Sequence, residues 1–198
     1  MDIDGFHHVC RAAASIANST ELTVFGSASV LPYLYEKGIR SMSALMGSAT
    51  LATHELDVTA GDDKLDTTID AIIGELSQFD ETFGYYGHGA GIEVALLPSG
   101  WKERARRISY EFLNGSVNIT VPHPHDTMVA KLAAGREKDH RFAIALLKVF
   151  PASRETIERL AGEAVEAHEE QQAQIETCVR HFLDAHPEAL SVSCAPET

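Results

Sequence analysis

The sequence predicts an α+β fold, in which a small mixed sheet with flanking helices is followed by a C-terminal helical layer. Two observations support this prediction. Segments in which apolar and polar residues alternate, as they do along strands, all lie before Pro122. Beyond Pro122 the apolar residues recur at helical spacing. We therefore expect an α/β core over residues 1–122 and a helical region over residues 123–198 that packs on this core.

Helices and strands are expected to alternate in the first part of the core. Gly26 closes the first strand and Gly38 stops the next helix, because glycine adopts the backbone conformations of turns and helix ends. In the segment THELDVT, Glu55 and Asp57 alternate with apolar residues, which is the period-two pattern of a strand. The expected elements are helices over residues 6–18 and 28–37 and strands over residues 20–25 and 53–59.

The rest of the chain is expected to contain one more helix, three strands and then only helices. Apolar residues recur at helical spacing after the turn at Gly61, and the segment GIEVALL has the character of a strand that Pro98 ends. Asn114 and Gly115 between two strand-like segments are a strong hairpin signal. The expected elements are a helix over 66–79, strands over 91–97, 107–113 and 116–121, and helices over 125–134, 137–150, 153–168 and 171–185.

The composition is that of a globular protein in a reducing compartment. Hydrophobic residues make up 44% of the 198 residues and charged residues 23%, which is enough apolar material for a core. The three cysteines, Cys10, Cys178 and Cys194, are scattered and odd in number, which argues against a disulfide framework. The N-terminus is acidic, and no apolar run reaches the roughly 18 residues that span a bilayer. We expect a cytoplasmic protein with no membrane partner.

The charge is strongly negative and unevenly distributed. The formal net charge is −13, and residues 151–198 hold ten acidic residues against three arginines. Broad, salt-dependent docking on DNA or RNA needs clustered lysine and arginine, so this charge argues against it. The segment WKERARR at residues 101–107 offers one small basic strip, through Arg104, Arg106 and Arg107.

Two acids on one strand are the first candidate for chemistry. Glu55 and Asp57 are two residues apart, so both carboxylates project from the same face. Two like charges side by side favour a bound cation, and hard oxygen ligands suit Mg²⁺, which also binds phosphate oxygens. A pair of this kind taken alone is more often two ordinary acids that face solvent.

The turn that precedes this strand makes the interpretation more specific. Gly26 and Ser27 follow an apolar strand and precede a helix, where backbone N–H groups can receive a phosphate and the Ser27 hydroxyl can add a contact. A third carboxylate is expected where two ions support an in-line displacement. Glu93, in the middle of an expected strand, is the first choice for a third metal ligand, and Glu111 is the reserve.

Two charges in the helical region are unusual. Lys131 is the one charge in the apolar segment TMVAKLAA, so it must extend to solvent or meet an anion such as a nucleotide phosphate. Asp139 lies at the head of the apolar stripe of the next helix. A purely structural role is equally open for both residues, either as a helix N-terminal acid or as a Lys131–Asp139 salt bridge.

Other polar clusters are weaker candidates. The pairs His7-His8 and His123-x-His125 lack a second ligand pair at a known zinc spacing, so zinc is not expected. The glycine-rich segment at residues 84–91 (GYYGHGAG) lacks the Lys-Ser/Thr that follows in a P-loop. We expect this segment to be a flexible tip over the site.

These residues together resemble the AbiEii-type group of bacterial nucleotidyltransferases, which includes toxins of toxin–antitoxin and phage-defence systems. The resemblance covers about residues 20–150. It departs from the group's pattern at Leu51, where arginine is frequent, and at Glu55, where the group has aspartate. The motifs that carry it are Gly26-Ser27, Thr53-x-Glu55-Leu56-Asp57-Val58, Pro98-x-Gly100-Trp101-x-x-Arg104 and Lys131-Leu132-x-Ala134-Gly135-Arg136-Glu137-Lys138-Asp139.

The resemblance implies a nucleotidyltransferase-type sheet, Mg²⁺ held by Glu55 and Asp57, and a nucleoside triphosphate contacted by Ser27 and Lys131. It implies that Asp139 helps to activate an attacking hydroxyl. The implied reaction transfers a nucleoside monophosphate to an RNA or protein acceptor, and a cognate antitoxin is an implied partner. A non-catalytic nucleotide-binding or interaction module of the same fold is the alternative. A helical adaptor that uses the acidic C-terminal helices is a third.

Overall fold

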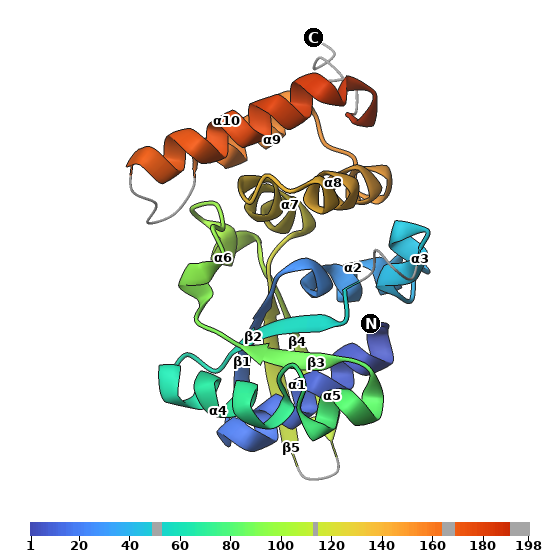
Figure 1. Ribbon diagram of the computed structural model, residues 1–198, viewed down its shortest axis with the longest axis vertical. Helices are drawn as coiled ribbons and strands as arrows, with labels where there is room; N and C mark the ends of the chain where they lie inside the picture. The colour runs from blue at the N-terminus through green and yellow to red at the C-terminus, as the bar shows by residue number, and fades with distance from the viewer. Residues whose placement is uncertain (49–52, 113–114, 164–168, 191–198) are drawn as a thin grey trace. The chain divides into compact units, whose positions relative to one another are not determined.

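The computed structural model describes residues 1–48, 53–112, 115–163 and 169–190 (Figure 1). It confirms the expected fold class, with a five-stranded mixed sheet, flanking helices and C-terminal helices. The chain forms two compact units: Met1–Ala95 with Lys102–His123, and Leu96–Trp101 with Pro124–Thr198. The departure at Leu51 and the cysteine Cys194 lie outside the described residues. No helix among the described residues combines the length and apolar character needed to cross a membrane.

The first unit is organised around one sheet with the strand order β3-β2-β1-β5-β4. The central strand β1 pairs antiparallel with β2 and parallel with β5. Strand β2 pairs parallel with β3, and β4 pairs antiparallel with β5, as the hairpin signal predicts. The strands are β1 (Glu21–Phe25), β2 (Glu55–Thr59), β3 (Tyr86–Gly89), β4 (Arg106–Phe112) and β5 (Gly115–Val121).

Helices α1 (Ile3–Ala17) and α4 (Asp63–Ile73) cover one face of this sheet. Figure 1 shows both helices, with α5 (Gln78–Phe83), on the same side of the strands. Burial of apolar side chains from every second strand position stabilises the packing. Fully or almost fully buried residues on these strands include Leu22, Val24, Leu56, Val58 and Ile119. The remaining helical elements of this unit are η1 (Ser27–Val30), α2 (Leu31–Glu36), α3 (Met42–Met46) and η3 (Ile92–Val94).

The prediction of a single helix over residues 66–79 is wrong in its second half. Helix α4 ends at Ile73, and α5 begins after Ser77, whose Oγ accepts a hydrogen bond from the Asp80 N–H. A Cβ at Gly74 would lie 2.2 Å from the Asp70 carbonyl oxygen, so this position requires glycine. Leu76, an apolar residue within the expected helix, is 84% exposed and has a φ of 61°.

The prediction of a strand over residues 91–97 is also wrong. Residues Ile92–Val94 form the short 3₁₀ helix η3, and the strand beside β2 is β3, inside the glycine-rich segment expected to be a loop. Glycine makes β3 possible because α1 and α4 approach it closely. A Cβ at Gly87 would lie 2.7 Å from Val9 Cγ1, and one at Gly89 would lie 1.9 Å from the Asp66 carbonyl oxygen.

The second unit is helical, as expected from the spacing of its apolar residues. Helix α10 packs against α7 and α9, and α7 packs against α8. The end of the helix expected over residues 153–168 lies outside the described residues. Buried side chains include Phe142, Leu146, Ile157, Val179 and Phe182. The elements are α7 (Pro124–Ala133), α8 (Glu137–Val149), α9 (Arg154–Gly162), α10 (Glu169–Ala185) and η4 (Pro187–Ala189), and α6 (Trp101–Arg104) lies at the division between the units.

Three histidines meet in this unit and predict a pH effect on its stability. The ring of His140 on α8 lies 6.3 Å from that of His181 on α10 and 6.2 Å from that of His186, measured between centroids. Burial lowers the pKa of His140, and His186 and His181 lower it further, against the opposing charges of Asp139 and Glu137. The folded chain therefore binds fewer protons at His140 than the unfolded chain does.

Because of this difference, we expect stability to fall as pH drops through about 6.5, the ordinary histidine value. Urea unfolding of the full chain at pH 7.5 and 5.5 measures the effect. In His140→Gln the loss of stability between these two pH values should be smaller than in the wild type. An equal loss in the two proteins would contradict a contribution from His140.

Candidate active site

The two predicted acids lie on the sheet face opposite to α1 and α4. In β2, Leu56 and Val58 are fully buried beneath these helices, so Glu55 and Asp57 project from the other face. The Glu55 side chain is 38% exposed and the Asp57 side chain is 17% exposed. Both carboxylates are thus accessible from one side and supported by the sheet on the other.

His88 joins this pair from the neighbouring strand. The register of β3 places His88 opposite Asp57 and Tyr86 opposite Glu55. His88 Nδ1 lies 3.0 Å from Asp57 Oδ1 and 3.2 Å from Glu55 Oε1. Among the described residues, these three form the group of histidine, cysteine and acidic side chains whose ligand atoms all lie within 4.8 Å of one another. His88 was not among the site residues predicted from the sequence.

The electrostatic field of this face favours cations. The pKa of His88 is raised by its hydrogen bond to Asp57, against partial burial, and the charges of Asp57, Glu55 and Asp70 raise it further. Burial and the charge of Glu55 raise the pKa of Tyr86 to about 12. Negative charge thus raises the pKa of both groups, and for Tyr86 burial is the larger cause.

Gly26 is held directly against Asp57. Its φ is +71°, and a Cβ built there would lie 1.9 Å from Asp57 Oδ2. Ser29 fixes the turn, since its buried Oγ donates a 2.7 Å hydrogen bond to the Gly26 carbonyl oxygen. Ser27 begins η1, which is a 3₁₀ helix of four residues. The helix expected over residues 28–37 therefore starts as a short 3₁₀ turn, which has a weaker dipole than a long α-helix.

The donor set fits a divalent cation. Adjacent ligands of an octahedral ion with bonds of about 2.1 Å lie roughly 3 Å apart, which matches the two measured separations from His88 Nδ1. The carboxylates of Glu55 and Asp57 supply hard oxygen donors and His88 supplies one nitrogen. Because Gly26 has no side chain, the Asp57 carboxylate can occupy the space beside this residue.

The two further carboxylates considered from the sequence lie elsewhere. Glu93 is exposed in η3 rather than in a strand, because β3 already fills the sheet edge beside β2. Its carboxylate folds back over its own turn, where a Cβ at Gly91 would lie 2.0 Å from Glu93 Oε1. Glu111 is exposed on β4, at the opposite edge of the sheet. Neither residue belongs to the group around Asp57 in the described chain.

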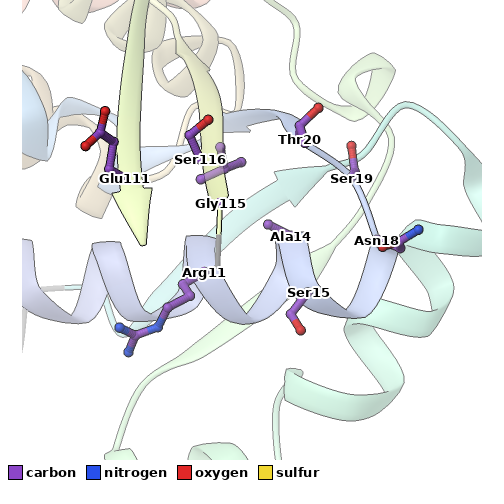
Figure 2. A pocket seen from close by; sticks show the side chains of 10 residues that line it. Arg11, Ala14, Ser15, Asn18, Ser19, Thr20, Glu111, Gly115 and Ser116 are labelled. Atoms are coloured by element: carbon purple, nitrogen blue, oxygen red, sulfur yellow. The ribbon is translucent and has the colours of Figure 1, made fainter. Parts of the chain in front are cut away.

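Glu111 instead lines a separate hollow of about 790 Å³ (Figure 2). The hollow lies between the second half of α1 and the start of β5, and it shares no residue with the group around Asp57. Its other labelled side chains include Arg11, Ser15, Asn18 and Ser116.

Lys131 and Asp139 belong to the second unit. Lys131 is half-buried on α7, between the buried residues Val129 and Leu132. Asp139 is buried at the start of α8, where Arg136 Nε donates to its Oδ2 at 2.6 Å. The salt bridge that the structure gives Asp139 is therefore with Arg136, and the alternative Lys131–Asp139 pair is not formed among the described residues.

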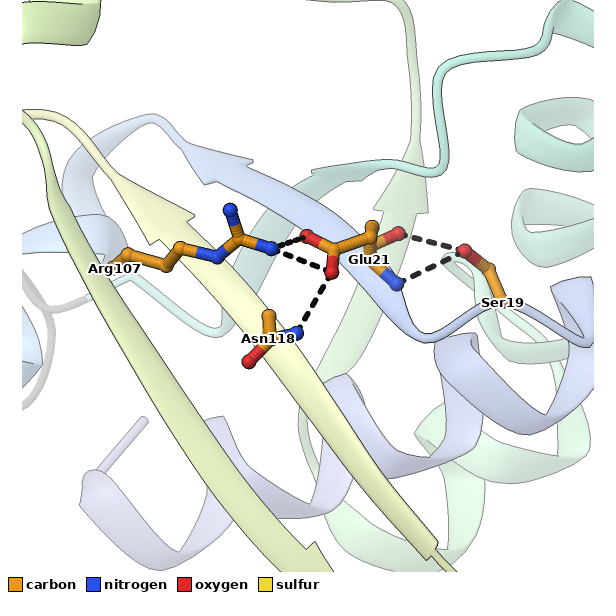
Figure 3. A network of polar contacts seen from close by, with 4 residues as sticks. All are labelled: Ser19, Glu21, Arg107 and Asn118. Atoms are coloured by element: carbon orange, nitrogen blue, oxygen red, sulfur yellow. Dashed lines mark hydrogen bonds and ion pairs between the residues drawn. The ribbon is translucent and has the colours of Figure 1, made fainter.

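The basic strip is largely neutralised by acids of its own unit. Arg107 Nη2 lies 2.6 Å from both carboxylate oxygens of Glu21, which also accepts a hydrogen bond from Asn118 (Figure 3). Arg106 pairs with Glu36 and lies over the Tyr33 ring. The contacts that a nucleic acid would need from Arg106 and Arg107 therefore compete with these internal pairs.

Comparisons with known proteins agree with a nucleotide-dependent site. A family model described as a nucleotidyltransferase of unknown function (DUF6036) matches residues 6–186, which include all three residues of the group around Asp57. A comparison with curated proteins and one with solved structures found no match.

Proposed function

We propose, on the premise that this chain belongs to the DUF6036 family of nucleotidyltransferases, that it transfers a nucleoside monophosphate from a nucleoside triphosphate to an acceptor and releases pyrophosphate. The observation that carries this proposal is the group of Glu55, Asp57 and His88 beside the Gly26 turn. Membership of this family implies that the substrate is a nucleoside triphosphate and that the usual cofactor is a divalent metal.

Each residue has a defined role in this proposal. Glu55 and Asp57 would hold a divalent cation such as Mg²⁺. When bound, this cation would supply positive charge that neutralises the triphosphate. The Gly26 turn places the Ser27 hydroxyl where it contacts the triphosphate. Lys131 binds a phosphate and Asp139 accepts the proton of the attacking hydroxyl. Arg136 holds the Asp139 carboxylate in position, because its Nε and Nη2 each donate a hydrogen bond to one carboxylate oxygen.

The acceptor is RNA or protein. The net charge of −13 and the internal pairing of Arg106 and Arg107 favour a protein acceptor or a short RNA end over an extended nucleic acid. A cytoplasmic location and a cognate antitoxin, both expected from the sequence, belong to the proposal as well.

A non-catalytic nucleotide-binding module is the second candidate. The exposed position of Glu93 favours it, because the carboxylate expected to complete the metal site is not in the group around Asp57. A module of this kind would bind a nucleoside triphosphate with the same metal dependence and would transfer nothing.

The experiment that separates the two candidates is incubation of the protein with Mg²⁺, each α-³²P-labelled nucleoside triphosphate and total cellular RNA. Label on RNA or on the protein itself, absent with Asp57→Asn, supports the enzyme and identifies its nucleotide. Metal-dependent nucleotide binding without transfer of label supports the module.

We expect Lys131→Met to raise the KM for the nucleoside triphosphate by about tenfold or more, because a charge-assisted phosphate contact is lost while the aliphatic stem is retained. The unfolding free energy should change little, and Lys138→Met, at an exposed position on α8, is the control with unchanged KM. Unchanged KM in both variants would leave Lys131 with a structural role alone.

A further inference from the structure

The imidazole in the metal-binding group has consequences for which cation the site selects. The polar contacts of the His88 ring within the described chain are with Asp57 and Glu55, both through Nδ1. The ring therefore faces the space between the two carboxylates, where a shared cation would lie. Nδ1 donates a 3.0 Å hydrogen bond to Asp57 Oδ1. A cation bound between the carboxylates would replace the Nδ1 proton, and a spacing of roughly 3 Å is also that of adjacent ligands of an octahedral ion.

The backbone of β3 holds His88 in this position. Gly87 and Gly89 lie against α1 and α4, where a Cβ at either residue would collide with Val9 or with the Asp66 backbone. Because side chains alternate along a strand, the residue between these glycines must point to the opposite face. Because His88 is the register partner of Asp57 in the β2–β3 pair, its side chain lies directly beside that of Asp57.

A nitrogen donor changes the preference among divalent cations. Mg²⁺ favours oxygen ligands, keeps several waters and binds proteins through carboxylates and substrate phosphates. Imidazole suits Zn²⁺, Cu²⁺, Fe²⁺ and Ni²⁺, whereas carboxylates suit both Mg²⁺ and Mn²⁺. Of the two ions that prefer carboxylates, Mn²⁺ is a transition metal and accepts a nitrogen ligand more readily than Mg²⁺ does. Two carboxylates, one imidazole and the oxygens of a triphosphate make a set that Mn²⁺ can satisfy more fully than Mg²⁺.

We propose that His88 Nδ1 is the third protein ligand of the metal and that the site consequently prefers Mn²⁺ over Mg²⁺. This inference rests on the proposed function for the presence of a metal at Glu55 and Asp57, and it adds the identity of the ion and of its nitrogen ligand. His88 thereby becomes the residue that determines metal specificity.

Pulsed electron paramagnetic resonance of bound Mn²⁺ tests the ligand directly, because a coordinated imidazole couples its ¹⁴N nucleus to the metal electrons. The wild type should show this coupling and His88→Gln should not. His54→Gln is the matched control, since His54 immediately precedes Glu55 and its ring contacts the Gly84 carbonyl oxygen instead. Coupling should persist in this control.

Titration of Mn²⁺ and Mg²⁺ tests the preference. The ratio of Mn²⁺ to Mg²⁺ affinity should fall at least about tenfold in His88→Gln, the usual scale for loss of a metal-site contact. If Mn²⁺ binds without ¹⁴N coupling, or if His88→Gln leaves the ratio of Mn²⁺ to Mg²⁺ affinity unchanged, the proposed role of His88 is wrong. The proposed function still stands in that case if the protein has transfer activity. No metal binding, together with no transfer activity, overturns both.

Discussion

Replacement of Asp57 by asparagine should reduce the rate of nucleotidyl transfer by about 10³-fold. Losses of this size are typical when a group that stabilises charge in the transition state is removed. Asparagine keeps the shape of the side chain but removes the negative charge that faces both His88 and the proposed cation. The fold should survive, because the substitution adds no volume and removes a partly buried charge from beside Glu55. Transfer rates at increasing metal concentration, with urea unfolding of the same samples, measure the two effects separately.

Glu111→Gln is the matched control for Asp57→Asn. Glu111 is also a strand carboxylate of the same unit, but it lies exposed on the far edge strand β4. Its variant should retain the wild-type rate. Equal losses in the two variants would mean that general charge, rather than the group around Asp57, supports activity.

Gly26→Ala should be the second most damaging change. The new Cβ would lie 1.9 Å from Asp57 Oδ2, so the carboxylate must move away from His88 and from the cation. We expect a loss of activity of about 10²-fold, since a small misplacement of a catalytic group has effects of this size. Transfer rates and metal affinity should fall together.

Gly38→Ala separates this displacement from simple backbone strain. Gly38 has a φ of +79°, close to that of Gly26, but a Cβ there meets nothing within 4 Å. Gly38→Ala should lose about 1 kcal/mol of unfolding free energy because of its positive φ. Gly26→Ala should lose more, because its φ of 71° and ψ of −171° form a backbone conformation that is essentially restricted to glycine. Only Gly26→Ala should lose activity, and a loss in Gly38→Ala as well would show that the effect is global.

Periodicity predicted most of the fold because most elements bury one regular face. Strands β1 and β2 and the hairpin of β4 and β5 follow the alternation of apolar residues, and the C-terminal helices follow helical spacing. Strand β3 escaped prediction for a physical reason. Glycine is unfavourable in strands taken alone, but close packing of α1 and α4 requires it at Gly87 and Gly89.

The break between α4 and α5 shows the opposite failure. The apolar residues through Leu76 continue at helical spacing, yet Leu76 is exposed and the chain turns at Gly74. Spacing alone does not distinguish an apolar residue in the core from one displayed beyond the helix end.

The candidate site was predictable in part. Glu55 and Asp57 could be paired from local alternation, since two residues on one strand share a face without reference to any other element. His88 lies 31 residues further along the chain from Asp57 and reaches it only through the β2–β3 register. The spacing Gly-His-Gly was the available signal, because glycine within a strand can mark a close approach of another backbone on its own face and leaves the residue between on the opposite face. Glu93 was chosen on an expected strand that the chain does not form.

The central claim is that the α-phosphorus of the nucleotide is attacked and that pyrophosphate leaves. Parallel reactions with α-³²P- and γ-³²P-labelled nucleoside triphosphate, the divalent metal and the acceptor test this most directly. The proposed function predicts that the α-label stays with the acceptor and that the γ-label is released as pyrophosphate. Transfer of the γ-label to the acceptor, or its release as inorganic phosphate without α-transfer, would contradict nucleotidyl transfer.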